Sequence, residues 1–204
     1  MRTSLVKISS AKPEMAKLKR AALILRDGGL VVFPTETVYG LGANMRDKKA
    51  IERVYCIKNR PKNKPLTIHI ADIDMVEKMV GKIPTNAKKL AAKFWPGPLT
   101  LILKDKNGKK TGFRMPDNRI AFLLIKEAAV PVVAPSANIS GERPPTNAKE
   151  VLRSLDGKMD MVLDGGRTKI GVESTVVDLS GRGFKILREG AISEKEIRKV
   201  ILKT

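Results

Sequence analysis

Residues 30–44 read LVVFPTETVYGLGAN, and several later segments of the chain repeat the same pattern. The four apolar residues 30–33 predict a buried strand, and Pro34 interrupts it because proline has no backbone N–H to donate. Small polar side chains follow at once, and two glycines, Gly40 and Gly42, come shortly after them. A strand that served only for packing would not need these groups at its exit. We therefore expect a ligand beside this segment.

Strand-like and helix-like segments alternate along all 204 residues. The expected strands occupy 5–8, 30–33, 66–70, 99–104, 131–136, 160–164, 174–179 and 184–189. The expected helices occupy 13–27, capped by Ser10, 48–58, capped by Asp47, and also 72–80, 85–94, 119–129, 147–155 and 193–202. This order predicts one α/β domain, residues 1–204, with a twisted mixed β-sheet flanked by helices and a basic concave cleft.

The composition limits the classes of protein that the chain can belong to. Apolar residues make up 42% of it, which is enough for a folded core, and the formal net charge of +19 favours an anionic ligand such as a nucleotide, a phosphate or RNA. The single cysteine cannot form an internal disulfide and indicates a cytoplasmic location. No apolar run is long enough for a membrane span, so we expect no membrane partner.

Several familiar catalytic motifs are absent. The segment GLGANM lacks the third glycine of a dinucleotide fingerprint, because Met45 stands at that position. The chain has no G-x-x-x-x-G-K-[ST] loop and no G-x-S-x-G elbow, and with one cysteine and one histidine a zinc site of the usual type is excluded. We therefore expect no metal site built by the protein, and catalysis by positioning and charge.

Four clusters share one design, in which an apolar strand meets a loop of hydroxyl, amide or basic side chains. They are 34–42 after the first long strand, 57–70 (IKNRPKNKPLTIHI), 135–141 (PSANISG) and 171–178 (GVESTVVD). Ligands of α/β sheets usually bind where strands end. In the second cluster Thr67 and His69 share one strand face, and Ile68 and Ile70 share the other. We expect the four clusters to meet at one site.

Taken together, these segments resemble the YrdC-type threonylcarbamoyl-AMP synthase family. The matching pieces are FPTETVYGLGAN, the K-x-R of Lys58 and Arg60 followed by KPLTIHI, WPGPLTLIL, RMPDN, APSANISG, GVESTVVD and ILREGAI, in family order from about residue 10 to residue 193. The resemblance implies a nucleotidyltransferase that forms threonylcarbamoyl-AMP and pyrophosphate from L-threonine, bicarbonate and ATP. It also implies Mg²⁺ bound mainly by the phosphates, and a partner transferase complex that modifies tRNA.

The resemblance also assigns the candidate residues. Those implied around threonine are Thr35, Tyr39, Arg60, His69 and Ser174. Those implied at the nucleotide are Lys58, Arg60, Lys64, Arg114, Ser136, Asn138 and Arg188, of which Lys58, Arg60, Ser136 and Asn138 are the expected catalytic set. We further expect Gly40 and Gly42 to leave space beside threonine, and replacement of Lys58 or Arg60 to leave the fold intact. His69 and substrate bicarbonate are both candidates for accepting the proton of the threonine ammonium group.

Two other functions are compatible with parts of the sequence. The first is a non-catalytic module for tRNA or double-stranded RNA, which the net charge favours, although an aromatic content of 4% argues against base stacking on single strands. Weak RNA binding is also possible for the enzyme itself. The second is the carbamoyl-transfer domain of hydrogenase maturation proteins, but the chain shows neither their acylphosphatase module nor their cysteine-rich zinc module.

Overall fold

The computed structural model describes residues 2–202, so residues 1, 203 and 204 of the expected domain lie outside the described part. The strands are β1 (Ser4–Lys7), β2 (Val31–Pro34), β3 (Tyr39–Asn44), β4 (Thr67–His69), β5 (Leu99–Lys104), β6 (Lys110–Arg114), β7 (Val132–Val133), β8 (Met161–Asp164), β9 (Thr175–Asp178) and β10 (Lys185–Arg188). The helices are α1 (Met15–Arg26), α2 (Lys48–Ile57), α3 (Asp74–Val80), α4 (Thr85–Phe94), α5 (Arg119–Ala128), α6 (Ala148–Leu155) and α7 (Glu194–Leu202).

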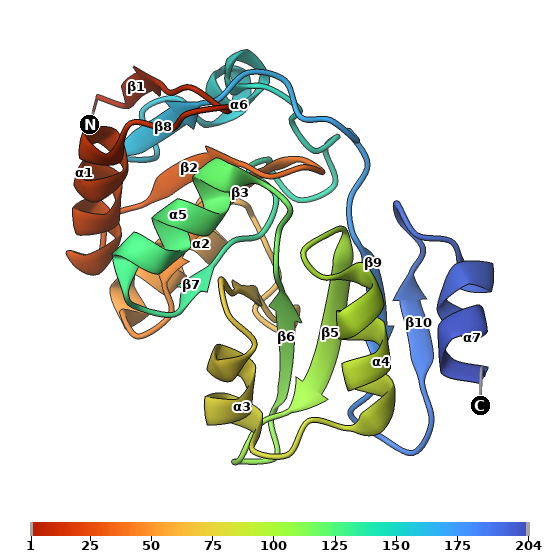
Figure 1. Cartoon of the computed structure of the whole chain (residues 1–204). Helices are drawn as coiled ribbons and strands as arrows, with labels where there is room; N and C mark the ends of the chain where they lie inside the picture. The colour runs from red at the N-terminus through yellow and green to blue at the C-terminus, as the bar shows by residue number, and fades with distance from the viewer. Residues whose placement is uncertain (1, 203–204) are drawn as a thin grey trace.

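Within the described residues, the strands form one ten-stranded mixed sheet in the order β1-β8-β2-β3-β7-β4-β6-β5-β9-β10. The parallel pairs are β1–β8, β8–β2, β4–β6 and β5–β9, and the remaining neighbours are antiparallel. The sheet twists strongly: the strands around β8 run across the view of Figure 1, whereas β5, β6, β9 and β10 stand upright. The expected α/β class with a twisted mixed sheet is confirmed.

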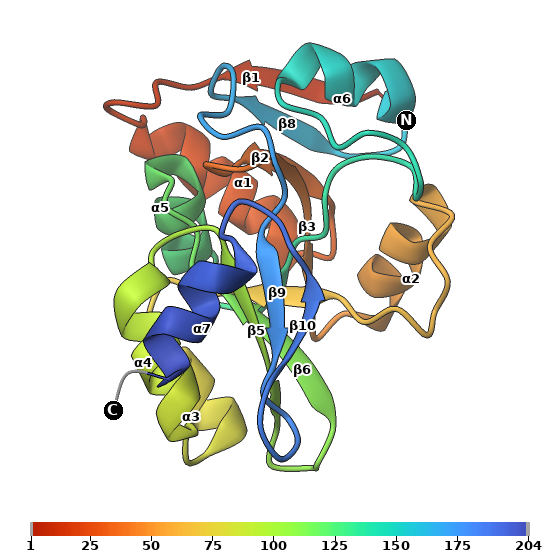
Figure 2. The ribbon, with the colours of Figure 1, turned by 90° about the vertical axis from the view of Figure 1, so that its right-hand side faces the viewer.

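Both faces of the central strands are covered by helices, which explains their unbroken apolar sequence. Val31 and Phe33 of β2 pack into a core with α1 and α5, and Leu30 and Val32 belong to a larger core that includes residues of α2, α4 and α6. Figure 2 shows α1 and α5 on one side of the sheet and α2 on the other. Successive side chains of a strand point to opposite faces, so each of these faces needs its own apolar set.

The exit of β2 brings two of the polar clusters together. Pro34 ends β2 and pairs with Tyr39, so the chain reverses over residues 35–38 and returns as β3. On its far side β3 meets the segment after β7, where Gly40 forms a bridge with Ser136 and the N–H of Leu41 donates to the carbonyl of Pro135. The first and third polar clusters therefore lie side by side.

Two strands were not predicted, and both lie inside the sheet. β3 contains Gly40 and Gly42, and β6 begins with a lysine and contains Gly112, so neither has a strong intrinsic preference for strand. β3 lies between β2 and β7, and β6 lies between β4 and β5. Hydrogen bonds to neighbours on both sides thus decide their conformation, and this information is not local.

The two capping predictions had different outcomes. Asp47 caps α2 as expected, since its side chain accepts a hydrogen bond from the N–H of Ala50 at 3.0 Å. The prediction for Ser10 was wrong: the N-cap of α1 is Glu14, and the hydroxyl of Ser10 donates to the carbonyl of Gly165 instead. Ser10 therefore forms its hydrogen bond with a loop that lies 155 positions away in the sequence, and not with the start of α1.

The expectation that Gly42 leaves space for a ligand was also wrong. Gly42 pairs with Val31 inside the hairpin and does not line the cavity described below. A Cβ atom at this position would lie 2.8 Å from Cε1 of Phe33 and 2.9 Å from the carbonyl oxygen of Val31. The glycine is therefore required for close packing between β2 and β3.

We predict that Gly42→Ala lowers the free energy of unfolding by about 1–3 kcal/mol, because the added methyl group overpacks the hairpin. Urea denaturation would measure the change. Gly181→Ala is the matched control: a Cβ atom there meets open space, so its effect should stay within about 0.5 kcal/mol. Equal stability of the two variants would contradict the packing role of Gly42.

Candidate active site

A cavity of about 590 Å³, including its open mouth, lies where the four polar clusters meet. Its lining comes from the β2–β3 turn, the loop after α2, and strands or strand ends of β4, β5, β6, β7, β9 and β10. The lining residues are Thr35, Val38, Tyr39, Gly40, Arg60, Thr67, His69, Thr100, Arg114, Ala134, Pro135, Ser136, Glu173, Ser174 and Arg188.

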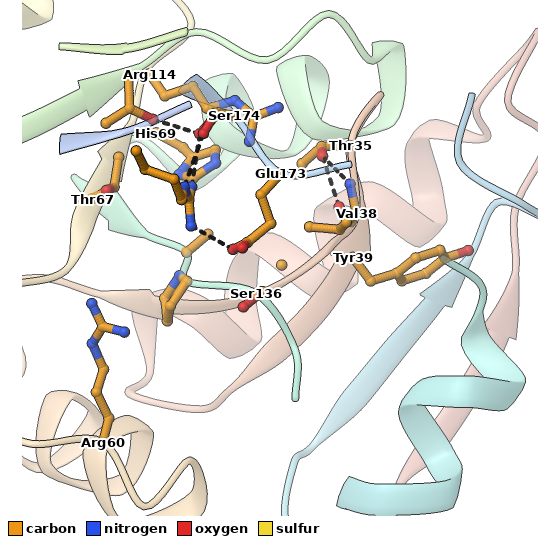
Figure 3. Close-up of a pocket in the computed structure, with 15 residues that line it drawn as sticks. Thr35, Val38, Tyr39, Arg60, Thr67, His69, Arg114, Ser136, Glu173 and Ser174 are labelled. Carbon is orange, nitrogen blue, oxygen red and sulfur yellow. Dashed lines mark hydrogen bonds and ion pairs between the residues drawn. The ribbon is translucent and has the colours of Figure 1, made fainter. Parts of the chain in front are cut away.

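One end of the cavity is enclosed and holds Arg114, His69 and Ser174, which are only 2–5% exposed (Figure 3). Arg114 Nη2 donates to Oε1 of Glu36 at 2.8 Å and to Oγ1 of Thr37 at 2.7 Å, and both partners are buried. Nε of Arg114 is buried without a hydrogen-bond partner. A buried cation with an unused donor is suited to an anionic group of a ligand.

His69 is neutral in the folded protein. Burial, assisted by the nearby charge of Arg114, lowers the pKa of His69 from 6.5 to about 3. Its Nδ1 is buried and has no hydrogen-bond partner. Thr67 and His69 both line the cavity, whereas Ile68 and Ile70 lie in the core, as the predicted alternation of strand faces requires.

The hydroxyl of Thr35 is engaged in its own turn. It donates to the carbonyl of Val38 at 2.7 Å and accepts from the N–H groups of Thr37 and Val38 at 3.2 Å each. The hydroxyls of Thr35 and Thr37 are 2.9 Å apart, and since Thr35 donates to Val38, Thr37 must donate to Thr35. Thr35 thus reaches the cavity with its oxygen already bonded, and it links the turn to Arg114 through Thr37.

Two further arginines, Arg60 and Arg188, and the one lining carboxylate among the described residues, Glu173, are more exposed than Arg114. Arg188 forms an ion pair with Glu173 at 2.7 Å and donates to the carbonyl and hydroxyl oxygens of Ser174 at 3.1 and 3.3 Å. The hydroxyl of Ser174 is also 2.8 Å from that of Thr100. Three arginines against one carboxylate leave the lining with a positive charge.

Arg60 stands apart from the other lining residues, across the cavity from Arg114 (Figure 3). Its guanidinium is held by the loop that follows, since Nε donates to the carbonyl of Lys64 at 3.1 Å and Nη2 to that of Pro65 at 2.9 Å. Burial, with a smaller effect from Arg188, lowers the pKa of Arg60. An anion bound between Arg60 and Arg188 would relieve the repulsion between these two cations.

The structure does not place Lys58, Lys64 or Asn138 in the cavity lining. Lys58 is 1% exposed, and its Nζ donates to the carbonyls of Ser136 and Asn138 at 2.5 and 2.6 Å. Burial, followed by the charge of Arg60, lowers the pKa of Lys58 to about 8. Lys58 therefore ties the end of α2 to the loop after β7, and this loop contributes Ser136 to the cavity.

The end of α2 explains why Lys58 and Arg60 point to different places. Asn59 adopts a left-handed conformation, with φ 47°, and the N–H of Arg60 donates back to the carbonyl of Tyr55 at 3.0 Å. This is the hydrogen-bond pattern of a Schellman helix end, and asparagine tolerates the left-handed region better than most residues. The turn leaves Lys58 buried at the helix end and directs Arg60 to the cavity.

Tyr39 and Asn138 use their polar atoms within the protein. The hydroxyl of Tyr39 donates to the carbonyl of Gly166 at 2.6 Å and points away from the other lining residues (Figure 3). Burial and the charge of Asp164 raise the pKa of Tyr39. The side-chain amide of Asn138 donates to the carbonyls of Ile139 and Glu142 at 2.9 and 2.8 Å, and its Oδ1 is buried without a partner.

Sequence reasoning omitted three polar residues of the lining from the candidate set, and one of them is Thr67, which was named in the second cluster without a role. Glu173 was visible in the fourth cluster but received no role, and Thr100 was read as part of an apolar strand. The available signal for Thr100 was a lone hydroxyl between leucines. Within residues 2–202, no group of three histidine, cysteine, aspartate or glutamate side chains could hold a metal ion, and no helix is long and apolar enough to cross a membrane.

Comparisons with known proteins agree with this geometry. The Sua5/YciO/YrdC family model, whose description reads "Telomere recombination", matches residues 23–190. The chain belongs to this family. A threonylcarbamoyl-AMP synthase of Pyrococcus abyssi is 47% identical over 194 residues, covering 91% of this chain and 57% of the relative, and one of Bacillus subtilis is 45% identical over 204 residues, covering 95% and 58%.

A solved structure of a family member has the same fold. The crystal structure of P. abyssi Sua5 complexed with L-threonine superposes with a TM-score of 0.93 at 44% identity, covering 98% of this chain and 61% of that one. This chain of the Sua5/YciO/YrdC family thus spans less than two thirds of the length of these relatives.

We predict a pH effect that arises from His69, the one histidine of the chain. His69 stays neutral when folded but takes up a proton below pH 6.5 when unfolded, so acid favours the unfolded chain. The stability present above pH 6.5 is lost progressively as the pH falls towards 3. Between pH 6.5 and 5 the free energy of unfolding should fall by about 1.6 kcal/mol more in the wild type than in His69→Asn. Parallel pH profiles from urea denaturation would contradict this prediction.

The burial of Lys58 also changes what its replacement should do. Lys58→Met leaves the carbonyls of Ser136 and Asn138 without their donor, so we predict a loss of about 1–3 kcal/mol in the free energy of unfolding. This replaces the expectation that the fold would be unaffected. Exposed Lys62 is the control, and Lys62→Met should change stability by less than about 0.5 kcal/mol in the same urea titration. A Lys58→Met protein as stable as Lys62→Met would refute the role of Lys58 as a structural tie.

Proposed function

We propose that this chain is an L-threonylcarbamoyladenylate synthase, which forms threonylcarbamoyl-AMP and pyrophosphate from L-threonine, bicarbonate and ATP. The observation that carries the proposal is the cavity itself, which is lined by the buried cation Arg114 and by the more exposed cations Arg60 and Arg188. Two relatives above 40% identity are threonylcarbamoyl-AMP synthases, and the P. abyssi structure of the same fold was solved with L-threonine. Family, fold and charge distribution support the same reaction.

The reaction brings negative groups together, so the first task of the site is charge compensation. The threonine nitrogen attacks the carbon of bicarbonate, hydroxide leaves as water, and an N-carboxylate forms with net release of one proton. An oxygen of this carboxylate then attacks the α-phosphorus of ATP, the bond to the bridging oxygen breaks, and pyrophosphate leaves with the electron pair. Arg60 and Arg188 line the cavity and are partly exposed, so their guanidinium groups can bind phosphate oxygens.

The low pKa of His69 decides whether this residue can accept a proton when the N-carboxylate forms. A group whose conjugate acid has a pKa of about 3 is a poor acceptor for an ammonium proton. Two protons leave the nitrogen in this step: one leaves to solvent before the nitrogen attacks, and the other combines with the hydroxide that leaves bicarbonate and forms water. We assign to neutral His69 a role in contacting the substrate through its unpartnered Nδ1.

Mg²⁺ enters this proposal with the nucleotide, as the Mg-ATP complex. The lining offers one carboxylate, Glu173, which is partly exposed and paired with Arg188, and this small donor set fits an ion held mainly by phosphate oxygens and water. When bound, the ion would neutralise charge on the phosphates. The remaining assignments follow the candidate set. The residues around threonine are Thr35, Tyr39, Arg60, His69 and Ser174, and those toward the nucleotide are Lys58, Lys64, Ser136 and Asn138. Lys58 and Asn138 act indirectly, through the loop that they hold.

The product is a mixed anhydride that a further enzyme must consume. We propose that it serves a threonylcarbamoyl transferase complex acting on tRNA, in the cytoplasm, and that residues 1–204 act as a single domain. The competing function, a non-catalytic RNA-binding module, rests on the net charge of +19. The two differ in salt dependence, since RNA held by charge alone is released at moderate salt.

The proposal predicts pyrophosphate release from Mg-ATP that requires both L-threonine and bicarbonate, measured in about 0.3 M salt to suppress nonspecific binding of polyanions. Arg60→Ala should lower kcat by about 100-fold or more, because it removes a cation from the reacting phosphate. Arg198→Ala is the control: Arg198 pairs with Glu194 on α7, outside the cavity, so its activity should match the wild type. No release from the wild type, with RNA retained at that salt, would favour the binding module.

A further inference from the structure

Glu36 is the buried acid next to the cavity that the proposed mechanism leaves without a role. It is 3% exposed and does not line the cavity, and its Oε1 accepts the hydrogen bond from Nη2 of Arg114 at 2.8 Å. Its Oε2 is buried without a partner. A carboxylate in such a position is costly to bury, and the positive charge of Arg114 compensates for it.

The contacts of Arg114 fix its guanidinium group from one side only. Nη2 is held by Glu36 and Thr37, whereas Nε is buried and makes no hydrogen bond. Thr37 is itself held, because its hydroxyl donates to Thr35. The backbone around Glu36 is fixed as well: the N–H of Ile170 donates to the carbonyl of Glu36, and that of Gly171 to the carbonyl of Thr37. The guanidinium therefore has one defined orientation.

We propose that Glu36 is a positioning residue, which orients Arg114 so that its free N–H groups bind the carboxylate of the amino-acid substrate. This inference rests on the proposed function and moves Arg114 from the nucleotide to the amino acid. Arg114, His69 and Ser174 are buried and lie near one another in Figure 3, which suits a small anion. Arg60 and Arg188 are more exposed and suit the phosphates, and Arg188 borders the buried group through its hydrogen bond to Ser174. A carboxylate there would give the buried Nε of Arg114 the partner that it lacks.

The test measures the dissociation constant of L-threonine by calorimetry in the absence of ATP, for the wild type and for Glu36 variants. Glu36→Ala removes both the acceptor and the charge, and it should weaken threonine binding about 10- to 100-fold, the range of one charge-assisted hydrogen bond. Glu36→Gln keeps an acceptor at the same reach, so it should recover most of this loss. The KM for Mg-ATP should change by less than about threefold in the Gln variant, because the phosphates are assigned to Arg60 and Arg188, neither of which contacts Glu36.

The matched control is Asp178→Asn. Asp178 is also a largely buried carboxylate in an ion pair, with Lys110 at 2.9 Å, but it lies outside the cavity lining. Its loss should lower stability without changing the affinity for threonine. Urea denaturation of all variants shows whether they are folded at the temperature of the binding experiment.

A second readout follows Arg114 directly, through the ¹⁵N NMR signal of its Nε–H group, assigned by comparison with Arg114→Lys. In the wild type this signal should be protected from exchange and should shift on addition of L-threonine, and in Glu36→Ala both properties should be lost. Folded Glu36 variants with the wild-type affinity for threonine would overturn the role of Glu36 alone. A wild type that does not bind L-threonine would overturn both this assignment and the proposed function.

Discussion

Polar groups in the turn between β2 and β3 have no access to water, and the rest of the site is arranged to satisfy them. Thr35, Glu36 and Thr37 are 0–3% exposed, although they lie in irregular backbone without the regular hydrogen bonds of a sheet. Thr35 is bonded within the turn, but Glu36 and Thr37 have distant partners: Arg114 of β6 for their side chains, and the N–H groups of Ile170 and Gly171 for their carbonyls. Because a buried polar group without a partner costs free energy, the turn can exist only when β6 and the segment before β9 are in place. The same contacts bring these elements to the cavity.

The cavity changes in character from its enclosed end to its mouth. At the enclosed end, burial keeps His69 neutral, and the charge of Arg114 is balanced by a carboxylate behind it. At the mouth, Arg60 and Arg188 are partly exposed, and the pair of Arg188 with Glu173 can be exchanged for a ligand at low cost. Exchange of the Arg114–Glu36 pair would be far more costly, since removing one partner leaves a buried charge. The cavity therefore combines a fixed charge at Arg114 with more adaptable charges at Arg60 and Arg188.

The pair Lys58 and Arg60 shows how two cations of one short motif come to serve different purposes. Lys58 stays at the end of α2 and holds the loop after β7 through two carbonyls. The left-handed conformation of Asn59 turns the chain, so that Arg60 reaches the cavity. Both residues matter to the site in this arrangement, but only Arg60 lines the cavity. The structural role of Lys58 requires its burial, and this burial is the main reason why its pKa is lowered.

The sequence by itself determined the fold class, all seven helices of the described residues, eight of the strands and the four loops that form the site, because apolar periodicity, prolines and glycines act locally. It also identified eight of the fifteen lining residues as candidates, largely through the family resemblance. Only the tertiary structure decided that Gly40 and Gly42 lie in a central strand, that Ser10 serves a distant loop, and that Lys58 and the hydroxyl of Tyr39 turn toward backbone carbonyls. It likewise paired Glu36 with Arg114, 78 positions apart. Pairing of strands and compensation of buried charge depend on partners that are remote along the chain, so no local pattern of residues could have specified them.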